Sequence, residues 1–285
     1  MIVAVLSGKG GTGKTLVSVN LASISEESTY IDCDVEEPNG HLFFKPKAVV
    51  SEDVLVKYPE VDNALCNGCR KCVDFCKFNA IAYIKDKLLI FKEICHSCGG
   101  CMIVCPKNAL REEDRKIGEI KRGLSGQINV NIGILNPGEA SGVPIINGLL
   151  KDVKNYRGNI FIDCPPGSAC TVMESIKDAD YCLLVAEPTL FGVHNLEMVF
   201  NLVNLFKKPH GVLINKWIND DNPVTEFCKE KGIMILEKIP FDNNLGKINS
   251  NGKIAVKEGN YYKKIFSSIL EKLYEEVQDE RTINP

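Results

Sequence analysis

Two cysteine runs with the same spacing constrain this chain more than any other feature of its sequence. Together they hold eight of its 13 cysteines, namely Cys66, Cys69, Cys72 and Cys76, followed by Cys95, Cys98, Cys101 and Cys105. Each cysteine of the first run recurs at a constant offset in the second, and at the same offset the pair Asn79-Ala80 recurs as Asn108-Ala109. The segment is therefore predicted to be an internal repeat of two half-domains.

The spacing within each run suits iron–sulfur chemistry. Three thiolates separated by two residues on a tightly looped backbone can bind three irons of one cubane, and the fourth cysteine can bind the neighbouring cubane. Zinc is the alternative, because Cys-x-x-Cys pairs also form zinc ribbons, but those use two pairs separated by a longer span. The pattern resembles that of bacterial ferredoxins with two [4Fe–4S] clusters. The resemblance implies one cluster on Cys66, Cys69, Cys72 and Cys105, and the other on Cys95, Cys98, Cys101 and Cys76.

Composition is typical of a globular protein in a reducing compartment. Of the 285 residues 45% are hydrophobic and 25% charged, so the chain can bury a core without disulfides. A dense, odd set of cysteines then indicates metal ligation. A net charge of −3 argues against nucleic-acid binding, which needs a basic face. No apolar run approaches the roughly 18 residues of a membrane helix, and residues 1–7 do not resemble a signal peptide, so we expect a cytoplasmic protein without membrane partners.

A glycine-rich segment near the N-terminus has the pattern of a phosphate-binding loop. It follows an apolar strand, Ile2 to Leu6, and precedes a helical stretch. The glycines allow backbone N–H groups to surround phosphate oxygens, and the helix N-terminus adds partial positive charge. Lys14 is expected to reach the β and γ phosphates, and the Thr15 hydroxyl to bind Mg²⁺. The expected nucleotide-binding residues here are Gly8, Gly10, Gly11, Thr12, Gly13, Lys14 and Thr15.

A second lysine, Lys9, lies early in this loop. Such a lysine marks the deviant Walker A motif, and the chain resembles the MinD/ParA-type ATPases that carry it. The resemblance implies that Lys9 crosses a dimer interface to the partner's nucleotide, in the role of an arginine finger. It also implies catalytic roles for Lys14, for the switch I carboxylate Asp34 and for Asp163, which would hold Mg²⁺ through water. Gly167 would bring an N–H to the γ-phosphate.

Two further segments resemble the base-binding parts of the same family. The segment from Asn215 to Ile218 begins like the guanine motif Asn-Lys-x-Asp, but Ile218 replaces the aspartate that accepts hydrogen bonds from guanine. ATP is therefore favoured over GTP. The residues that match the family's adenine-contacting positions are Asn215, Pro240, Phe241 and Asp242.

Strand-like and helical segments alternate along the chain. Strands are expected at 2–6, 29–33, 130–135, 159–163, 181–186, 211–215 and 233–239, and helices at 14–24, 143–155, 169–178, 192–206, 222–231 and 260–277. The alternation predicts an α/β fold with a mostly parallel, doubly wound P-loop sheet and ligands at the carboxyl ends of its strands. The cysteine segment interrupts it. We therefore predict a discontinuous ATPase domain, 1–54 and 113–285, with a small inserted α+β ferredoxin-like domain at 55–112.

Five cysteines lie outside the two runs. Four are expected to be buried packing residues, namely Cys33, Cys164, Cys182 and Cys228. Cys170 lies at an expected helix N-terminus, which favours the thiolate. In the nitrogenase iron protein, which belongs to the family that the chain resembles, a ligand of the cluster shared between subunits lies at this offset from the Walker B aspartate. The sequence leaves the role of Cys170 open.

Three functions are compatible with these motifs. The favoured one is an ATP-hydrolysing iron–sulfur protein that couples nucleotide-dependent dimerisation to electron transfer, because two complete four-cysteine sets are typical of permanent redox centres. The alternative is an ATP-dependent carrier or assembly factor for iron–sulfur or other metal clusters. A positioning ATPase is less favoured, because such proteins often end in a basic amphipathic helix and this chain ends in an acidic one. The expected partners are a second copy or a related ATPase, and a redox partner or a metallocluster client protein.

Overall fold

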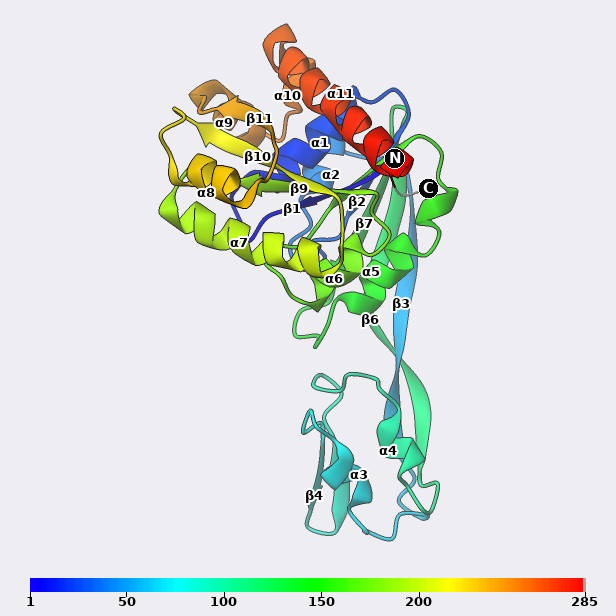
Figure 1. Cartoon of the computed structure of the whole chain (residues 1–285). Helices are drawn as coiled ribbons and strands as arrows, with labels where there is room; N and C mark the ends of the chain where they lie inside the picture. The colour runs from blue at the N-terminus through cyan, green and yellow to red at the C-terminus, as the bar shows by residue number, and fades with distance from the viewer. Residues whose placement is uncertain (284–285) are drawn as a thin grey trace.

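The computed structural model describes residues 1–283, which fold around a nine-stranded mixed sheet (Figure 1). The strand order is β11-β10-β9-β1-β8-β2-β7-β6-β3, and the seven strands from β11 to β7 are parallel. They are β1 (Ile2–Leu6), β2 (Ser28–Asp32), β7 (Ile128–Leu135), β8 (Asn159–Asp163), β9 (Tyr181–Ala186), β10 (His210–Trp217) and β11 (Ile235–Pro240). The predicted mostly parallel α/β sheet is confirmed.

Helices cover both faces of the sheet, because successive side chains of a strand point to opposite faces. In β1, Val3 and Val5 enter one core, and Ala4 and Leu6 enter the other. The core with Val3 also takes side chains from α1 (Lys14–Ile24), α2 (Gly40–Phe44), α9 (Asn243–Ser250), α10 (Ala255–Glu258) and α11 (Asn260–Ile283). The other takes them from α5 (Val143–Leu150), α6 (Cys170–Ile176), α7 (Leu190–Leu205) and α8 (Pro223–Lys231).

A long antiparallel ribbon leaves one edge of the sheet. It consists of β3 (Lys47–Val61) and β6 (Leu110–Ser125), and β6 pairs antiparallel with β7. At about 3.3 Å per residue, a strand of 16 residues spans about 50 Å. The ribbon therefore extends beyond the sheet and carries a smaller body at its far end (Figure 1). The sequence patterns predicted neither strand, and the proposed boundaries at 54/55 and 112/113 fall inside the ribbon.

The smaller body, here called the cysteine module (residues 55–112), repeats its backbone as well as its sequence. Its helices α3 (Lys71–Phe75) and α4 (Gly100–Ile103) begin at equivalent positions of the repeat. The hairpin of β4 (Ile81–Ile84) and β5 (Lys87–Ile90) pairs Ile81 with Ile90. The ends of β6 and β3 pair Leu110 with Val61, which are the repeat equivalents of Ile81 and Ile90. The predicted repeat is thus present in the strand pairing.

Most predicted elements are present within one or two residues of their expected bounds, and the two helices expected at 143–155 and 260–277 need correction. The helix expected at 143–155 ends at Leu150 and is followed by a separate 3₁₀ turn, η1 (Val153–Asn155). The strands expected at 130–135 and 211–215 are longer, because β7 starts at Ile128 and β10 runs from His210 to Trp217, and the helix expected at 260–277 continues as α11. Within residues 1–283, no helix combines the length and the apolar character that crossing a membrane requires.

Candidate nucleotide site and cysteine cavities

The glycine-rich loop joins β1 to α1 and takes its shape from two left-handed glycines. Gly11 has φ of 78° and Gly13 has φ of 101°, a region that residues with a Cβ adopt rarely. A Cβ on Gly13 would also lie 2.2 Å from Nδ2 of Asn215. That nitrogen donates a 2.7 Å hydrogen bond to the carbonyl of Thr12. Asn215, near the end of β10, therefore supports the loop.

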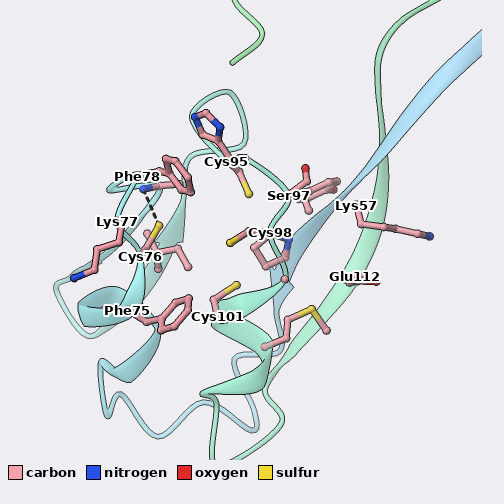
Figure 2. A pocket seen from close by; sticks show the side chains of 17 residues that line it. Lys57, Phe75, Cys76, Lys77, Phe78, Cys95, Ser97, Cys98, Cys101 and Glu112 are labelled. Atoms are coloured by element: carbon pink, nitrogen blue, oxygen red, sulfur yellow. Dashed lines mark hydrogen bonds between the residues drawn. The ribbon is translucent and has the colours of Figure 1, made fainter. Parts of the chain in front are cut away.

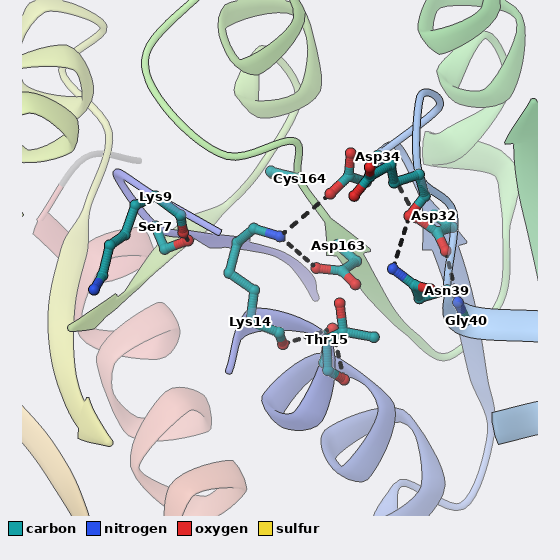
Figure 3. A network of polar contacts seen from close by, with 12 residues as sticks. Ser7, Lys9, Lys14, Thr15, Asp32, Asp34, Asn39, Gly40, Asp163 and Cys164 are labelled. Carbon is teal, nitrogen blue, oxygen red and sulfur yellow. Dashed lines mark hydrogen bonds and ion pairs between the residues drawn. The ribbon is translucent and has the colours of Figure 1, made fainter. Parts of the chain in front are cut away.

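Lys14 lies at the centre of a buried cluster of charges. Its Nζ is 3.5 Å from Oδ1 of Asp163 and 3.8 Å from Oδ2 of Asp34, and its side chain is 6% exposed (Figure 3). Burial lowers the pKa of Lys14, but the two carboxylates more than offset this and the pKa is raised. Burial raises the pKa of Asp34 to about 6, although Lys14 acts in the opposite direction. The structure thus brings three of the predicted catalytic residues together.

A second buried carboxylate, Asp32, holds the segment that carries Asp34. It accepts hydrogen bonds from the backbone N–H of Gly40 at 2.8 Å and of Asp34 at 3.2 Å. The Tyr30 hydroxyl donates to Asp163 at 3.0 Å. Burial, and then the charge of Asp163, raise the pKa of Asp32. Sequence reasoning missed this role of Tyr30. The only signal in the sequence is its hydroxyl, which needs a hydrogen-bond partner because the whole of β2 is buried.

A cavity of about 810 Å³ opens beside this cluster. Of the predicted site residues, those that line it are Gly10, Gly11, Thr12, Gly13, Lys14, Thr15 and Asp34. Among the described residues, Oγ1 of Thr12 is buried without a hydrogen-bond partner, and Oδ1 of Asp163 has only its 3.5 Å ion pair with Lys14. Buried polar atoms of this kind need partners. Phosphate oxygens, Mg²⁺ and its waters would supply them, so the residues present fit a magnesium nucleotide.

The remaining predicted nucleotide-site residues lie outside the lining of this cavity. The N–H of Gly167 donates to the carbonyl of Ser7 at 2.9 Å. Pro240 ends β11, and Phe241 is 58% exposed. The Asp242 carboxylate caps α9 through the N–H of Asn244 and accepts from the Tyr262 hydroxyl at 2.6 Å. Their contacts with a nucleotide remain predictions.

Lys9 points away from Lys14 and lies in a second ionic cluster (Figure 3). Its Nζ is 2.6 Å from Oε2 of Glu187, the residue that follows β9, and 5.1 Å from the ring centre of Phe191. Lys216 pairs with the same carboxylate and donates to the carbonyl of Gly11 at 3.1 Å. Glu187 therefore holds Lys9 on its own subunit. Sequence reasoning missed Glu187, because its partners lie far from it in the chain.

The eight cysteines of the two runs surround two cavities, and each cavity mixes the runs. Site A is defined by Cys66, Cys69, Cys72 and Cys105. Site B is defined by Cys95, Cys98, Cys101 and Cys76 (Figure 2). The cavity at site B measures about 320 Å³, and that at site A about 20 Å³. Site A is therefore the narrower of the two.

The backbone around both sites is built alike. The fourth cysteine of each run accepts a backbone N–H at its sulfur. Ala80 donates to Cys76 at 3.4 Å (Figure 2), and Ala109 donates to Cys105 at 3.3 Å. The left-handed positions also recur at equivalent places in the two half-domains, as Gly68 with Ser97, Arg70 with Gly99, and Asn79 with Asn108. N–H groups directed at sulfur stabilise thiolates that bind iron.

Each site offers four thiols, which is the donor set of one [4Fe–4S] cluster. Among the side chains that the structure describes, those of residues 1–278, no group of three or more His, Cys, Asp or Glu is arranged to hold one metal ion. A four-iron cubane is larger than an ion and holds its thiolates farther apart. Burial raises the pKa of Cys101 to about 11, with the charges of Cys95 and Cys98 adding to the rise. Four ionised thiolates at one site would therefore need a strong positive charge beside them, which a bound iron–sulfur cluster would supply.

The five cysteines outside the runs divide into buried and exposed thiols. Four are buried free thiols, namely Cys33, Cys164, Cys182 and Cys228. Burial raises the pKa of each of them. Cys170 is exposed at the first residue of α6. The prediction of four packing cysteines is therefore confirmed, and Cys170 differs from them in its exposure.

Comparison with known proteins gives the same picture of the nucleotide half. A family model described as the CobQ/CobB/MinD/ParA nucleotide-binding domain matches residues 3–256. The uncharacterized protein MJ0578 of Methanocaldococcus jannaschii is 32% identical over 284 residues, which covers 98% of this chain and 97% of that protein. MJ0579 of the same organism is 29% identical over 280 residues and covers 95% and 98%.

Solved structures of cell-division ATPases share the fold. MinD of Pyrococcus horikoshii with Mg-ADP has a TM-score of 0.59 at 17% identity and covers 95% of each chain. MinD of Pyrococcus furiosus has a TM-score of 0.60 at 18% identity and covers 96% of this chain and 98% of its own. Identities this low show the fold alone. The family model spans most of the sequence, and the chain's own phosphate loop has the two left-handed glycines described above. The chain therefore belongs to the CobQ/CobB/MinD/ParA family of nucleotide-binding domains.

Proposed function

We propose that this protein binds and hydrolyses Mg-ATP and couples nucleotide-dependent dimerisation to electron transfer through two [4Fe–4S] clusters. The observation that carries the proposal is the pair of cavities, each lined by three cysteines of one run and the fourth of the other. That crossed arrangement is what a two-cluster ferredoxin pattern requires. When bound, the clusters supply one-electron chemistry, and the chain's own residues hold and position them.

The nucleotide half supports hydrolysis of ATP by attack of water on the γ-phosphate. Lys14 neutralises the phosphates, and its place between Asp34 and Asp163 fixes its ammonium before a nucleotide arrives. Asp34 is positioned by Asp32 to orient the attacking water and the magnesium shell. Positioning and charge neutralisation are the main sources of catalysis in phosphoryl transfer. MinD of Pyrococcus horikoshii, which shares the fold, was solved with Mg-ADP.

The face beside the phosphate loop supports dimerisation. Leu190 and Phe191 at the start of α7 are 80% and 61% exposed, and Ile218 after β10 is 71% exposed. Adjacent exposed apolar side chains such as those of Leu190 and Phe191 are typical of protein interfaces. Closure of the dimer would release Lys9 from Glu187 and direct it to the partner's nucleotide. The partner is a second copy or a related chain, and Methanocaldococcus jannaschii holds two relatives of this protein.

A chain of contacts connects the nucleotide cavity to the ribbon. Val35 lines the cavity, and its carbonyl accepts from the N–H of Leu135 at 2.8 Å. The next residue, Asn136, donates its N–H to the carbonyl of Ile117 in β6 at 2.8 Å. The ladder shifts register opposite Ile117, between Val54 and Leu55, so the ribbon has an irregular point there. Movement of switch I on binding ATP would reach the cysteine module by this route.

Two measurements on anaerobically purified protein test the proposal. We expect about eight irons and eight acid-labile sulfides per chain, four for each cluster, together with Mg-dependent ATP hydrolysis. Cys105→Ser should lose one cluster, whereas Cys182→Ser, a buried cysteine outside both sites, should keep both. A single zinc ion per site, or iron that survives Cys105→Ser unchanged, would overturn the crossed ligation.

Lys14 of the phosphate loop provides the matching control for the ATPase half. Lys14→Ala should abolish hydrolysis and leave the iron content intact, because the cysteine module lies at the far end of the ribbon (Figure 1). Hydrolysis at the wild-type rate in this variant would contradict the proposed catalytic role of Lys14. Transfer of whole clusters to an apo-protein on hydrolysis, with loss of iron from the donor, would instead identify a cluster carrier.

A further inference from the structure

The two cysteine sites have unlike walls at positions that the repeat makes equivalent. Site A is lined by Arg70 and Lys107. The positions of site B that match them in the repeat are Gly99 and Phe78, and both line that cavity. At a third pair of positions, site A has Tyr83 where site B has the carboxylate of Glu112. The repeat therefore provides an internal comparison in which only site A carries cations at these positions.

Arg70, which lines site A, stacks on the ring of another lining residue, Tyr83. Its guanidinium carbon lies 4.9 Å from the ring centre of Tyr83, and the Tyr83 hydroxyl lies against Gly68. Arg70 has φ of 60°, a conformation that costs a residue with a Cβ, whereas Gly99 has φ of 70° without that cost. Site A thus keeps an arginine at a backbone position where its sister site uses glycine.

The wall of site B that matches Lys107 is aromatic. Phe78 stacks on the ring of His96, with ring centres 3.9 Å apart and planes 16° apart. Two lysines also line this cavity, but Figure 2 shows the ammonium ends of Lys57 and Lys77 directed away from the sulfur atoms. Lys57 Nζ pairs with Asp114 at 2.8 Å. Lys92 lies behind Tyr58 of the same wall and donates to its hydroxyl at 2.8 Å. The lysines that line site B thus direct their charge away from it, and Glu112 adds a negative charge to its wall.

We propose that Arg70 and Lys107 set the reduction potential of site A above that of site B, so that an electron delivered to site B moves on to site A. The inference rests on the proposed function, because it requires a [4Fe–4S] cluster at each site. Reduction adds one negative charge to a cluster, and nearby cations stabilise that charge. One electron leaves site B and the same electron enters site A, with no bond or proton exchanged. An external one-electron donor supplies it.

An anaerobic potentiometric titration followed by EPR tests this inference on the full-length holoprotein. The wild type should titrate as two one-electron couples. Arg70→Gln and Lys107→Gln should each lower the higher potential and leave the lower one in place. We expect the double variant to change the electron partition between the sites at least tenfold, which corresponds to about 59 mV for a one-electron couple. Because both side chains are exposed, the shift should shrink at high ionic strength.

Two further variants separate a charge effect from damage to the fold. Lys71→Gln removes a neighbouring exposed cation that lines neither cavity, so neither potential should move. Phe78→Lys places a cation at the matching position of site B and should raise the lower potential. Equal shifts of both potentials in Arg70→Gln would overturn the inference. So would a higher potential that stays in place in both Arg70→Gln and Lys107→Gln. A protein without two titrating clusters would instead overturn the proposed function.

Discussion

Lys14, Asp34 and Asp163 illustrate what short motifs can predict at the scale of residues. Each lies at the carboxyl end of a parallel strand or shortly after one, where side chains from separate strands meet. Their meeting within 3.8 Å follows from the topology. Glu187 and Tyr30 were not foreseen, because their contacts depend on which strands become neighbours rather than on local sequence.

The raised pKa of Asp34 predicts an acid limit for activity. Orienting water requires the ionised carboxylate, and burial raises the pKa of this group to about 6. As the pH falls below about 6, kcat/KM for Mg-ATP should decrease tenfold per pH unit, and it should be level above that pH. Steady-state rates between pH 5 and 8 would check this.

A neighbouring carboxylate provides the control for this profile. The charge of Glu37 contributes to raising the pKa of Asp34. Glu37→Gln should therefore move the acid limit to lower pH. A profile that stays level down to pH 5 in the wild type would show that Asp34 does not need to ionise in this range.

At the scale of elements, the ribbon of β3 and β6 is the main feature that the sequence did not reveal. The side chains of β3 are mostly exposed, and those of β6 are mostly exposed or half-buried, so neither an apolar run nor a regular alternation marks the ribbon. Pairing between the two strands stabilises the ribbon instead, over a register from Lys47 with Leu124 to Val61 with Leu110. By contrast, α1 and β1 match their expected bounds because local pattern and burial agree there.

The base of the ribbon depends on a partly buried ion pair. Both nitrogens of the Arg115 guanidinium fork reach the Glu139 carboxylate, at 2.8 and 2.7 Å, and the side chains are 16% and 10% exposed. Glu139→Gln leaves the arginine charge buried and unpaired, so we expect a loss of about 3–5 kcal/mol in the free energy of unfolding. Urea denaturation of the anaerobic protein would measure it.

A surface pair on the same ribbon is the matched control. Lys116 and Asp53 lie 2.6 Å apart with side chains 44% and 57% exposed. Asp53→Asn should change the free energy of unfolding by less than about 1 kcal/mol, because water screens exposed pairs. Equal effects of the two substitutions would show that the Arg115–Glu139 pair does not anchor the ribbon.

At the scale of the whole molecule, the cysteine module lies at the end of an arm and the nucleotide cavity lies in the main body (Figure 1). The sequence led us to expect an ATPase domain with an insert at 55–112. It did not predict the arm between them, whose length determines how far the module can reach. A dimer that closes over the nucleotide would fix the position of one subunit's arm relative to the arm of the other subunit.

Solution scattering tests this movement. A non-hydrolysable ATP analogue with Mg²⁺ should convert the protein to a dimer that is more compact for its mass than two free chains. Lys9→Ala should bind the analogue but dimerise weakly, because it lacks the cation proposed to reach the partner's nucleotide. It should also hydrolyse ATP about 10³-fold more slowly, the lower end of the effect of an arginine finger. Identical scattering profiles with and without the analogue would contradict the closure.

The central claim is that ATP controls electron transfer through clusters held by the crossed cysteine sets. The most direct measurement is an anaerobic redox titration by EPR of the holoprotein, with and without Mg-ATP, with Lys14→Ala as the reference. The account predicts two cluster signals, at least one of whose potentials shifts when Mg-ATP is added to the wild type and stays in place in Lys14→Ala. Two clusters whose potentials are the same with and without Mg-ATP would contradict it.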